Sequence, residues 1–139
     1  MKHNRILGNL IKLGTALSIG LASTLALADN YPSKPIKAIV PFAPGSTTDQ
    51  IGRAFAAKMS ELLGQPVVIE NRPGANGLIG ADFVAKAPAD GYTILFGTNS
   101  TNAALKSLVK NLPYNQETAF APIGYFGSAP LIIAINNDV

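Results

Sequence analysis

The chain has 139 residues, with 11 Lys and Arg, 8 Asp and Glu, one histidine, no cysteine and a formal net charge of +3. Because the single histidine is His3, a Cys/His nucleophile, a Ser-His-Asp triad and a typical zinc site are excluded from the rest of the chain. The composition therefore argues against an enzyme and suggests no cofactor or metal, although chemistry by carboxylates alone stays formally open.

The first 28 residues have the layout of a secretory signal peptide. Three basic residues open the chain, residues 13–28 carry no charge, and the stretch ends in Ala26-Leu27-Ala28, a small-x-small cleavage pattern. The uncharged run is shorter than the roughly 20 residues that a membrane span needs, so an uncleaved anchor is only the alternative. We expect cleavage after Ala28, no stable membrane insertion afterwards, and a periplasmic location in a Gram-negative cell.

Removal of this segment changes the charge balance. The segment holds three of the 11 basic residues and none of the acidic ones, so eight of each remain in the mature chain. With a net charge of zero, the mature chain has no basic excess that would suggest nucleic acid or anionic lipid as a partner.

The most informative stretch joins an expected strand to an expected helix. Residues 36–40 form an apolar, partly β-branched run that predicts a buried strand. Apolar residues at 51, 55, 59 and 62 share one helical face and predict a helix over residues 48–63, which Gly64 would end. The loop between them reads Pro41-Phe42-Ala43-Pro44-Gly45-Ser46-Thr47-Thr48-Asp49.

That loop has the chemistry to hold an anionic group such as a carboxylate. A helix N-terminus leaves backbone N–H groups unpaired and carries partial positive charge. Gly45 lets the backbone approach a ligand, and the three hydroxyl residues after it add donors. The alternative is an ordinary strand-to-helix turn whose polar residues cap the helix.

Further strand, loop and helix patterns follow along the chain. The expected strands are 66–70, 92–96 and 131–135, the expected helices are 78–86 and 103–110, and polar loops lie at 71–77 and 97–102. Strands that alternate with helices predict an α/β fold with a mainly parallel sheet. Ligand sites in such sheets lie outside the carboxyl ends of the strands, so we expect all three polar loops at one edge.

Several motifs then occur in a specific order and spacing. They are Tyr31-Pro32-Ser33-Lys34-Pro35-Ile36, the 40–49 loop, Leu63-Gly64-Gln65-Pro66-Val67-Val68, Glu70-Asn71-Arg72-Pro73-Gly74-Ala75, Ile79-Gly80-Ala81, Ala87-Pro88-Ala89-Asp90-Gly91-Tyr92-Thr93 and Phe120-Ala121-Pro122-Ile123. This series resembles the substrate-binding proteins of tripartite tricarboxylate transporters, the Bug type of extracytoplasmic receptor. The resemblance covers essentially the whole mature chain.

The resemblance implies a periplasmic-binding-protein-like (type II) fold with flanking helices. Its two lobes would close like a Venus flytrap around a small carboxylate, such as a tricarboxylate, a dicarboxylate or a related organic acid. It also implies delivery to a membrane permease of the transporter and no chemical turnover. We expect the receptor to be a monomer without a cofactor.

In the family, a ligand carboxylate is held by the loop after the first strand and by the loop after a later strand. These regions match Phe42 to Asp49 and Gly97 to Thr101. The expected ligand contacts are Phe42, Ala43, Gly45, Ser46, Thr47, Thr48, Thr98, Asn99 and Ser100. Asp49, Arg72 and Asn76 are expected to brace loops or cap helices, because Asp49 would repel a carboxylate; Arg72 as a carboxylate clamp is the alternative. The chain departs from the family at Ser46, where a second glycine is usual.

Family members have roughly twice this length or more, in line with two domains of ordinary size. Residues 29–139 are therefore expected to hold most of the first lobe and to end near the first crossing to the second lobe. Such a part should not enclose a ligand alone, and titration with citrate would test this.

Two other functions stay open: a ligand-sensing partner of a membrane signalling protein, and an exported α/β enzyme acting on an anionic substrate. The chain lacks the Gly-Lys-Ser/Thr phosphate loop that would favour the enzyme.

Overall fold

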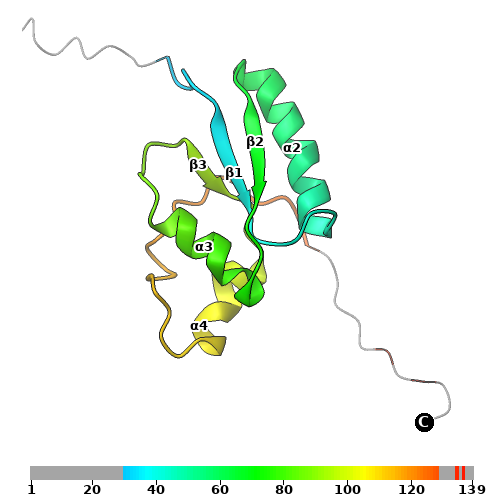
Figure 1. Ribbon diagram of the computed structural model, residues 1–139, viewed down its shortest axis with the longest axis vertical. Coiled ribbons are helices and arrows are strands. Elements are labelled where there is room, and N and C mark those ends of the chain that lie inside the picture. Colours follow the sequence, from blue (N-terminus) through cyan, green and yellow to red (C-terminus); the bar gives the residue numbers. More distant parts are fainter. Residues whose placement is uncertain (1–29, 129–133, 135, 137–139) are drawn as a thin grey trace, which may run out of the picture. The chain divides into compact units, whose positions relative to one another are not determined.

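The computed structural model describes residues 30–128, 134 and 136 (Figure 1). The expected signal peptide lies outside the described residues, and of the strand expected at 131–135 only Ala134 is described. All the elements named below belong to the unit that begins at Pro35. Within the described part, no helix combines the length and the apolar character needed to cross a bilayer.

Three parallel strands form the sheet, in the order β2-β1-β3 (Figure 1). They are β1 (Ile36–Val40), β2 (Val67–Asn71) and β3 (Thr93–Leu95). Strand β1 matches its expected range, whereas β2 starts one residue later than expected and β3 is shorter by one residue at each end. The central place of β1 explains its apolar sequence, because both of its edges and most of its side chains are covered.

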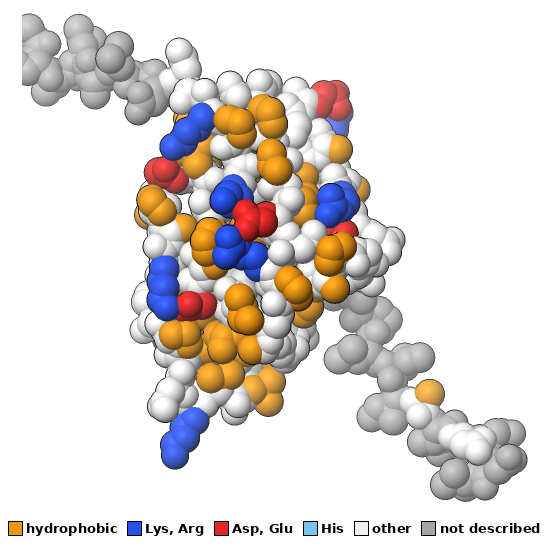
Figure 2. Space-filling view, in the orientation of Figure 1, with side chains coloured by type: hydrophobic (Ala, Val, Ile, Leu, Met, Phe, Trp, Pro, Cys, Tyr) orange, Lys and Arg blue, Asp and Glu red, His pale blue; other side chains and the backbone are white. Residues whose placement is uncertain are grey.

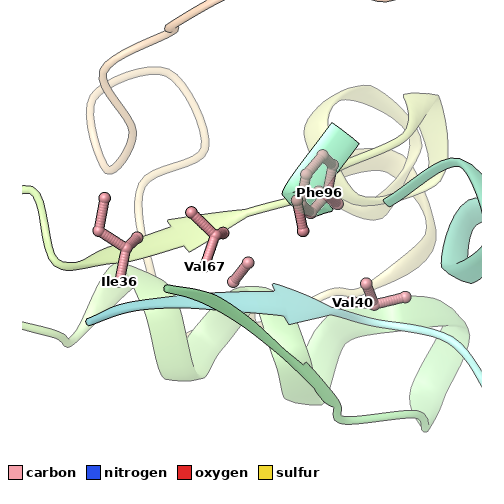
Figure 3. Close-up of a cluster of buried hydrophobic side chains, with 6 residues drawn as sticks. Ile36, Val40, Val67 and Phe96 are labelled. Carbon is pink, nitrogen blue, oxygen red and sulfur yellow. The ribbon is translucent and has the colours of Figure 1, made fainter. Parts of the chain in front are cut away.

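Successive side chains of β1 point to opposite faces of the sheet. Ile36, Ala38 and Val40 face helix α2 (Thr47–Leu63) and form a core with Ala56 of that helix. Val67 and Phe96, which come from β2 and from the end of β3, complete the same core. Figure 3 shows the labelled side chains Ile36, Val40, Val67 and Phe96 gathered along the strands.

The apolar stripe that predicts helix α2 is only partly the side that packs on the sheet: of its four residues, Met59 packs against the core. The buried residues of α2 are Asp49, Gly52 and Ala56, whereas Ile51 is 44% exposed and Leu62 is 73% exposed. Small residues let the helix come close to the strands, since a Cβ on Gly52 would lie only 3.2 Å from Val40 Cγ2. Close approach therefore decided which face of α2 is buried.

Part of this apolar stripe is covered by a later segment of the chain. The Phe126 ring lies with its centroid 4.1 Å from that of Phe55 on α2. It also lies 5.6 Å from the ring of Phe96, which belongs to the core. Phe126 thus anchors the stretch that follows residue 120 against α2 and the end of β3.

The second face of the sheet is partly covered by helix α3 (Leu78–Ala85). Its Phe83 ring lies 5.7 Å from Lys37 Nζ, and Lys37 occupies an odd position of β1. Because α2 packs on the even positions of β1, the two helices lie on opposite faces of the sheet. The sequence predicts flanking helices but not which face each one covers. Gly77 and Asn76 make the bend before α3 within the short 3-10 turn η2 (Ala75–Gly77).

The last helical segment begins earlier than its pattern indicates. A π-helical turn, η3 (Ser100–Ala104), leads into the short helix α4 (Leu105–Leu108). The expected loop at 97–102 is therefore shortened, and the helix expected at 103–110 is shifted toward the N-terminus. Burial explains the shift, because Thr101 and Leu105 are 0% and 1% exposed and tie the turn to the rest of the fold.

Candidate functional site at the carboxyl edge of the sheet

The loops that follow the three strands meet at one edge of the sheet. Gly77, at the end of the second loop, has a φ of +91°, and a Cβ on it would lie 2.5 Å from Thr101 Cγ2 and 3.5 Å from Phe42 Cζ. The second loop thus touches both the first loop and the turn after β3, as the sequence predicts. From the central strand β1 the chain goes first to β2 at one edge of the sheet and later to β3 at the other edge. The strand order therefore reverses beside β1, and α/β sheets bind ligands at such a switch point.

The loop from β1 to α2 is built on hydrogen bonds of its own. Ser46 is the N-cap of α2, and its Oγ accepts from the N–H of Asp49 at 3.2 Å. The N–H of Gly45, which has a φ of +81°, donates to Asp49 Oδ2 at 2.9 Å. The N–H of Ser46 donates to the carbonyl oxygen of Ala43 at 3.1 Å. The interpretation of this loop as a helix cap therefore applies. The backbone N–H groups of Gly45 and Ser46 are engaged in hydrogen bonds within the loop.

Two amides at the start of α2 are left over. The N–H groups of Thr47 and Thr48 have no acceptor among the residues that the structure describes. Thr47 is exposed and Thr48 is half-buried. Of the backbone donors expected to hold an anion, these two amides are the available ones, whereas those of Gly45 and Ser46 are already engaged.

The carboxylate of Asp49 is the centre of this loop. Its side chain is 4% exposed and accepts from Arg53 Nε at 2.9 Å and from Asn71 Nδ2 at 2.8 Å, in addition to the Gly45 amide. The hydrogen bond from Arg53 first, and then those from Gly45 and Asn71, lower the pKa of Asp49 to about 2. Asp49 is therefore ionised at neutral pH, and the guanidinium of Arg53 matches its charge.

Two members of this network received no role from sequence reasoning. Arg53 lies four residues after Asp49 on the same helix, a spacing that favours an ion pair, so that signal was present. Asn71 ends β2 and reaches Phe42 O and Asp49 across 29 and 22 residues of sequence. In the sequence, the only signal for a role of Asn71 is its place in the Glu70-Asn71-Arg72 motif.

In the described residues, the turn after β3 has a buried hydroxyl without a partner. The N–H of Thr98 donates to Thr101 Oγ1 at 2.9 Å, and the N–H of Asn102 donates to the Thr98 carbonyl oxygen at 2.9 Å. Thr98 Oγ1 is buried and has no hydrogen-bond partner among the described residues. Asn99 is exposed and Ser100 is half-buried.

Arg72 is engaged on the side of the sheet that carries α3. Its Nε donates to Glu70 Oε1 at 2.6 Å, and its guanidinium stacks 3.7 Å from the centroid of the Phe83 ring. Lys37 Nζ pairs with the other oxygen of Glu70 at 3.1 Å. On the face seen in Figure 2, basic side chains lie beside acidic ones, with hydrophobic side chains around them.

A cavity beside α3 is lined by none of the residues in the loops that directly follow β1 and β3. It has a volume of about 510 Å³ and is lined by Arg72, Ile79, Asp82, Phe83, Lys86, Ala87, Pro88 and Thr93. None of the residues expected to contact a ligand lines it. No group of acidic or histidine side chains in the described part could hold a metal ion.

Comparison with known proteins identifies the family. Residues 51–139 match the tripartite tricarboxylate transporter family receptor, which is well over half of the chain. The chain belongs to this family. BugT of Bordetella pertussis is 43% identical to this chain over 118 residues, which are 84% of the chain and 36% of BugT.

Two solved structures agree with the fold. MatC from Rhodopseudomonas palustris, solved with bound malate, superposes with a TM-score of 0.64 at 39% identity, over 66% of this chain and 31% of MatC. A second protein from R. palustris, solved with adipate, gives a TM-score of 0.61 at 42% identity, over 63% of this chain and 29% of that one. The family and the periplasmic-binding-protein-like fold that the sequence predicts are confirmed, and the chain spans 36% of the length of BugT.

Proposed function

We propose that this chain carries the carboxylate-gripping part of a periplasmic solute receptor for a small organic acid. The observation that carries the proposal is the pair of free amides, Thr47 and Thr48, at the edge where the three loops meet. In this proposal, one ligand carboxylate accepts hydrogen bonds from these two N–H groups and benefits from the positive end of α2. Membership in the receptor family, and the malate and adipate bound to MatC and its R. palustris counterpart, support this class of ligand.

Thr98 has a buried hydroxyl that lacks a partner among the described residues. Such a hydroxyl costs about 1–3 kcal/mol, and in this proposal a carboxylate oxygen that reached it would offset that cost. Asn99 and Ser100 add polar groups on the same turn. The expected contacts after β1 and β3 would then act on one ligand from two sides.

The chemistry of Asp49 favours binding over turnover. A general base works best with a pKa near the working pH, whereas the pKa of Asp49 is lowered to about 2. Its two oxygens are also occupied by Gly45, Arg53 and Asn71. In this proposal the receptor releases its ligand unchanged to a membrane permease of the transporter and works in the periplasm after export.

The test removes one free amide and leaves the helix intact. Proline is tolerated at the first position of a helix, and Ser46, with φ −64° and ψ 160°, already has the conformation that a residue before proline prefers. We therefore expect Thr47→Pro to keep the fold. Thr47→Ala, which removes the hydroxyl and the γ-methyl group but keeps the backbone N–H, is the matched control.

Binding is followed by the amide NMR shifts of Thr48, Thr98 and Asn99 during titration with malate and with adipate. Because the chain spans 36% of the length of BugT, we expect weak binding, with a Kd of about 1 mM. Loss of one hydrogen bond to a charged group should raise the Kd by about tenfold or more in Thr47→Pro. The uncharged dimethyl ester of malate should give no shifts. An equal Kd in Thr47→Pro and in the parent chain would contradict the proposal.

A further inference from the structure

We propose that Asn71 is a positioning residue for the anion-binding amides. Its side chain holds the loop between β1 and α2 against the end of β2, and so fixes the direction of the Thr47 and Thr48 N–H groups. The inference rests on the proposed function, because it assigns the support of the same site. It concerns a residue that would not itself touch the ligand.

The backbone of Asn71 is held where β1 turns into the loop. Asn71 is the last residue of β2 and pairs in register with Val40, the last residue of β1. The N–H of Arg72 then donates to the carbonyl oxygen of Val40 at 2.8 Å, which continues the pairing one residue beyond β2. The side chain of Asn71 therefore starts from a fixed point beside the loop.

The carboxamide of Asn71 uses its full donor capacity. Its Nδ2 donates to Phe42 O at 3.1 Å and to Asp49 Oδ1 at 2.8 Å. Its Oδ1 accepts from Arg53 Nη2 at 3.0 Å. A carboxamide has two N–H donors and one carbonyl acceptor, so both donors have partners and the oxygen is also engaged. Aspartate has the same shape but no donors, and leucine has neither donors nor an acceptor.

These bonds hold the loop at both ends. Asn71 fixes the start of the loop through Phe42, and it fixes the far end through Asp49, which in turn receives the Gly45 N–H at 2.9 Å. The backbone between these points, and the amides directly after it, therefore have little freedom to turn. Donors that already point at the place of a negative charge bind it without a cost of reorganisation.

The network also removes an electrostatic conflict. An ionised Asp49 beside the site would repel a carboxylate ligand, but Arg53 Nε lies 2.9 Å from its Oδ2. Asn71 contacts both Asp49 and Arg53, so it keeps the ion pair together while staying uncharged. Replacement by aspartate would add a second negative charge to the network.

The test uses the full 139-residue chain with Asn71→Asp and Asn71→Leu, and with Asn111→Asp as the control at an exposed asparagine. Amide hydrogen exchange is read at Gly45 and along β1. Titration with malate is read at the amides of Thr47 and Thr48. We expect both Asn71 variants to exchange the Gly45 N–H about tenfold faster and to bind malate with an about tenfold higher Kd. Exchange along β1 should stay unchanged, and Asn111→Asp should behave like the parent chain.

The possible results separate this inference from the proposed function. Unchanged Gly45 exchange, or an unchanged malate Kd, in both variants would overturn the inference alone. Equal acceleration of exchange along β1 and at Gly45 would also overturn it, since Asn71 would then only support the fold. If the parent chain gives no shift at Thr47 or Thr48 with malate or adipate, the proposed function fails and this inference fails with it.

Discussion

Gly77 lies so close to Thr101 that a Cβ on the glycine would stand 2.5 Å from Thr101 Cγ2. Gly77 also has a φ of +91°, a conformation that side chains with a Cβ rarely adopt. The contact joins the loop after β2 to the turn after β3 at the edge that carries the proposed site. A glycine at this position therefore decides how closely the second and third loops approach.

Gly77→Ala should lower the free energy of unfolding by about 2–4 kcal/mol, because the positive φ costs about 1–2 kcal/mol and the clash adds a similar amount. Gly64→Ala is the matched control, since Gly64 has a φ of +66° with open space around it. That control should lose only about 1–2 kcal/mol. Urea unfolding of both variants measures the difference. Equal losses would show that Thr101 exerts no steric constraint on Gly77.

Thr101→Val tests the hydroxyl that organises the turn after β3. Thr101 is 0% exposed, and its Oγ1 accepts from the N–H of Thr98 at 2.9 Å. Valine keeps the shape but leaves that amide without an acceptor, so we expect a loss of about 1–3 kcal/mol in the free energy of unfolding. Thr101→Ser keeps the hydroxyl and should cost only about 1 kcal/mol for the lost methyl group.

Thr101→Ser also provides a double-mutant cycle with Gly77→Ala. Serine removes the Cγ2 atom that a new Cβ on Gly77 would meet. The double variant should therefore lose clearly less stability than the sum of the two single variants. Additive losses would place the cost of Gly77→Ala in its backbone conformation alone.

Local sequence patterns were sufficient for most of the elements but not for the buried face of α2. The run Ile36–Val40 predicts β1 because four of its five residues are apolar, which suits a strand covered on both faces. The face of α2 depends on Gly52 and Ala56, which contribute little apolar surface and yet allow close approach to the sheet. A pattern of large apolar residues cannot report that preference, so the stripe of Ile51 and Phe55 indicated the helix but not its contact side.

The loop after β1 was located from the sequence because glycine, hydroxyl residues and the end of a strand occur together. Which of its amides are free was not predictable. The N–H of Gly45 donates to the buried carboxylate of Asp49, which also accepts a hydrogen bond from Asn71. That arrangement follows from the register of β2 against β1, which brings Asn71 beside Val40. Sheet register is a property of the folded chain, and local patterns do not contain it.

Arg72→Ala separates a structural arginine from a carboxylate clamp. Arg72 stacks 3.7 Å from the Phe83 ring centroid and pairs with Glu70 at 2.6 Å. Half-exposed contacts of these kinds are worth about 1 kcal/mol together, so the free energy of unfolding should fall by about that amount. The malate-induced shifts at Thr47 and Thr48 should keep the parent Kd. A tenfold rise in that Kd, with the same change in stability, would instead favour the clamp.

Asp49 should make the stability of the chain depend on pH in the acid range. Its pKa in the fold is about 2, below the ordinary value of 3.8, so the folded state favours the ionised form. The stabilisation from this group is fully present above about pH 4 and is lost as the pH falls toward 2, because the unfolded chain then binds a proton that the fold does not. Asp49→Asn should remove this dependence and leave only the smaller contributions of other carboxylates, such as Glu70.

Urea unfolding of both chains between pH 2 and pH 5, with the Asp49 carboxyl carbon followed by NMR, gives the comparison. An Asp49 midpoint near 4, or parallel pH profiles for the two chains, would show that the hydrogen bonds from Arg53, Gly45 and Asn71 do not hold the carboxylate as the structure places them.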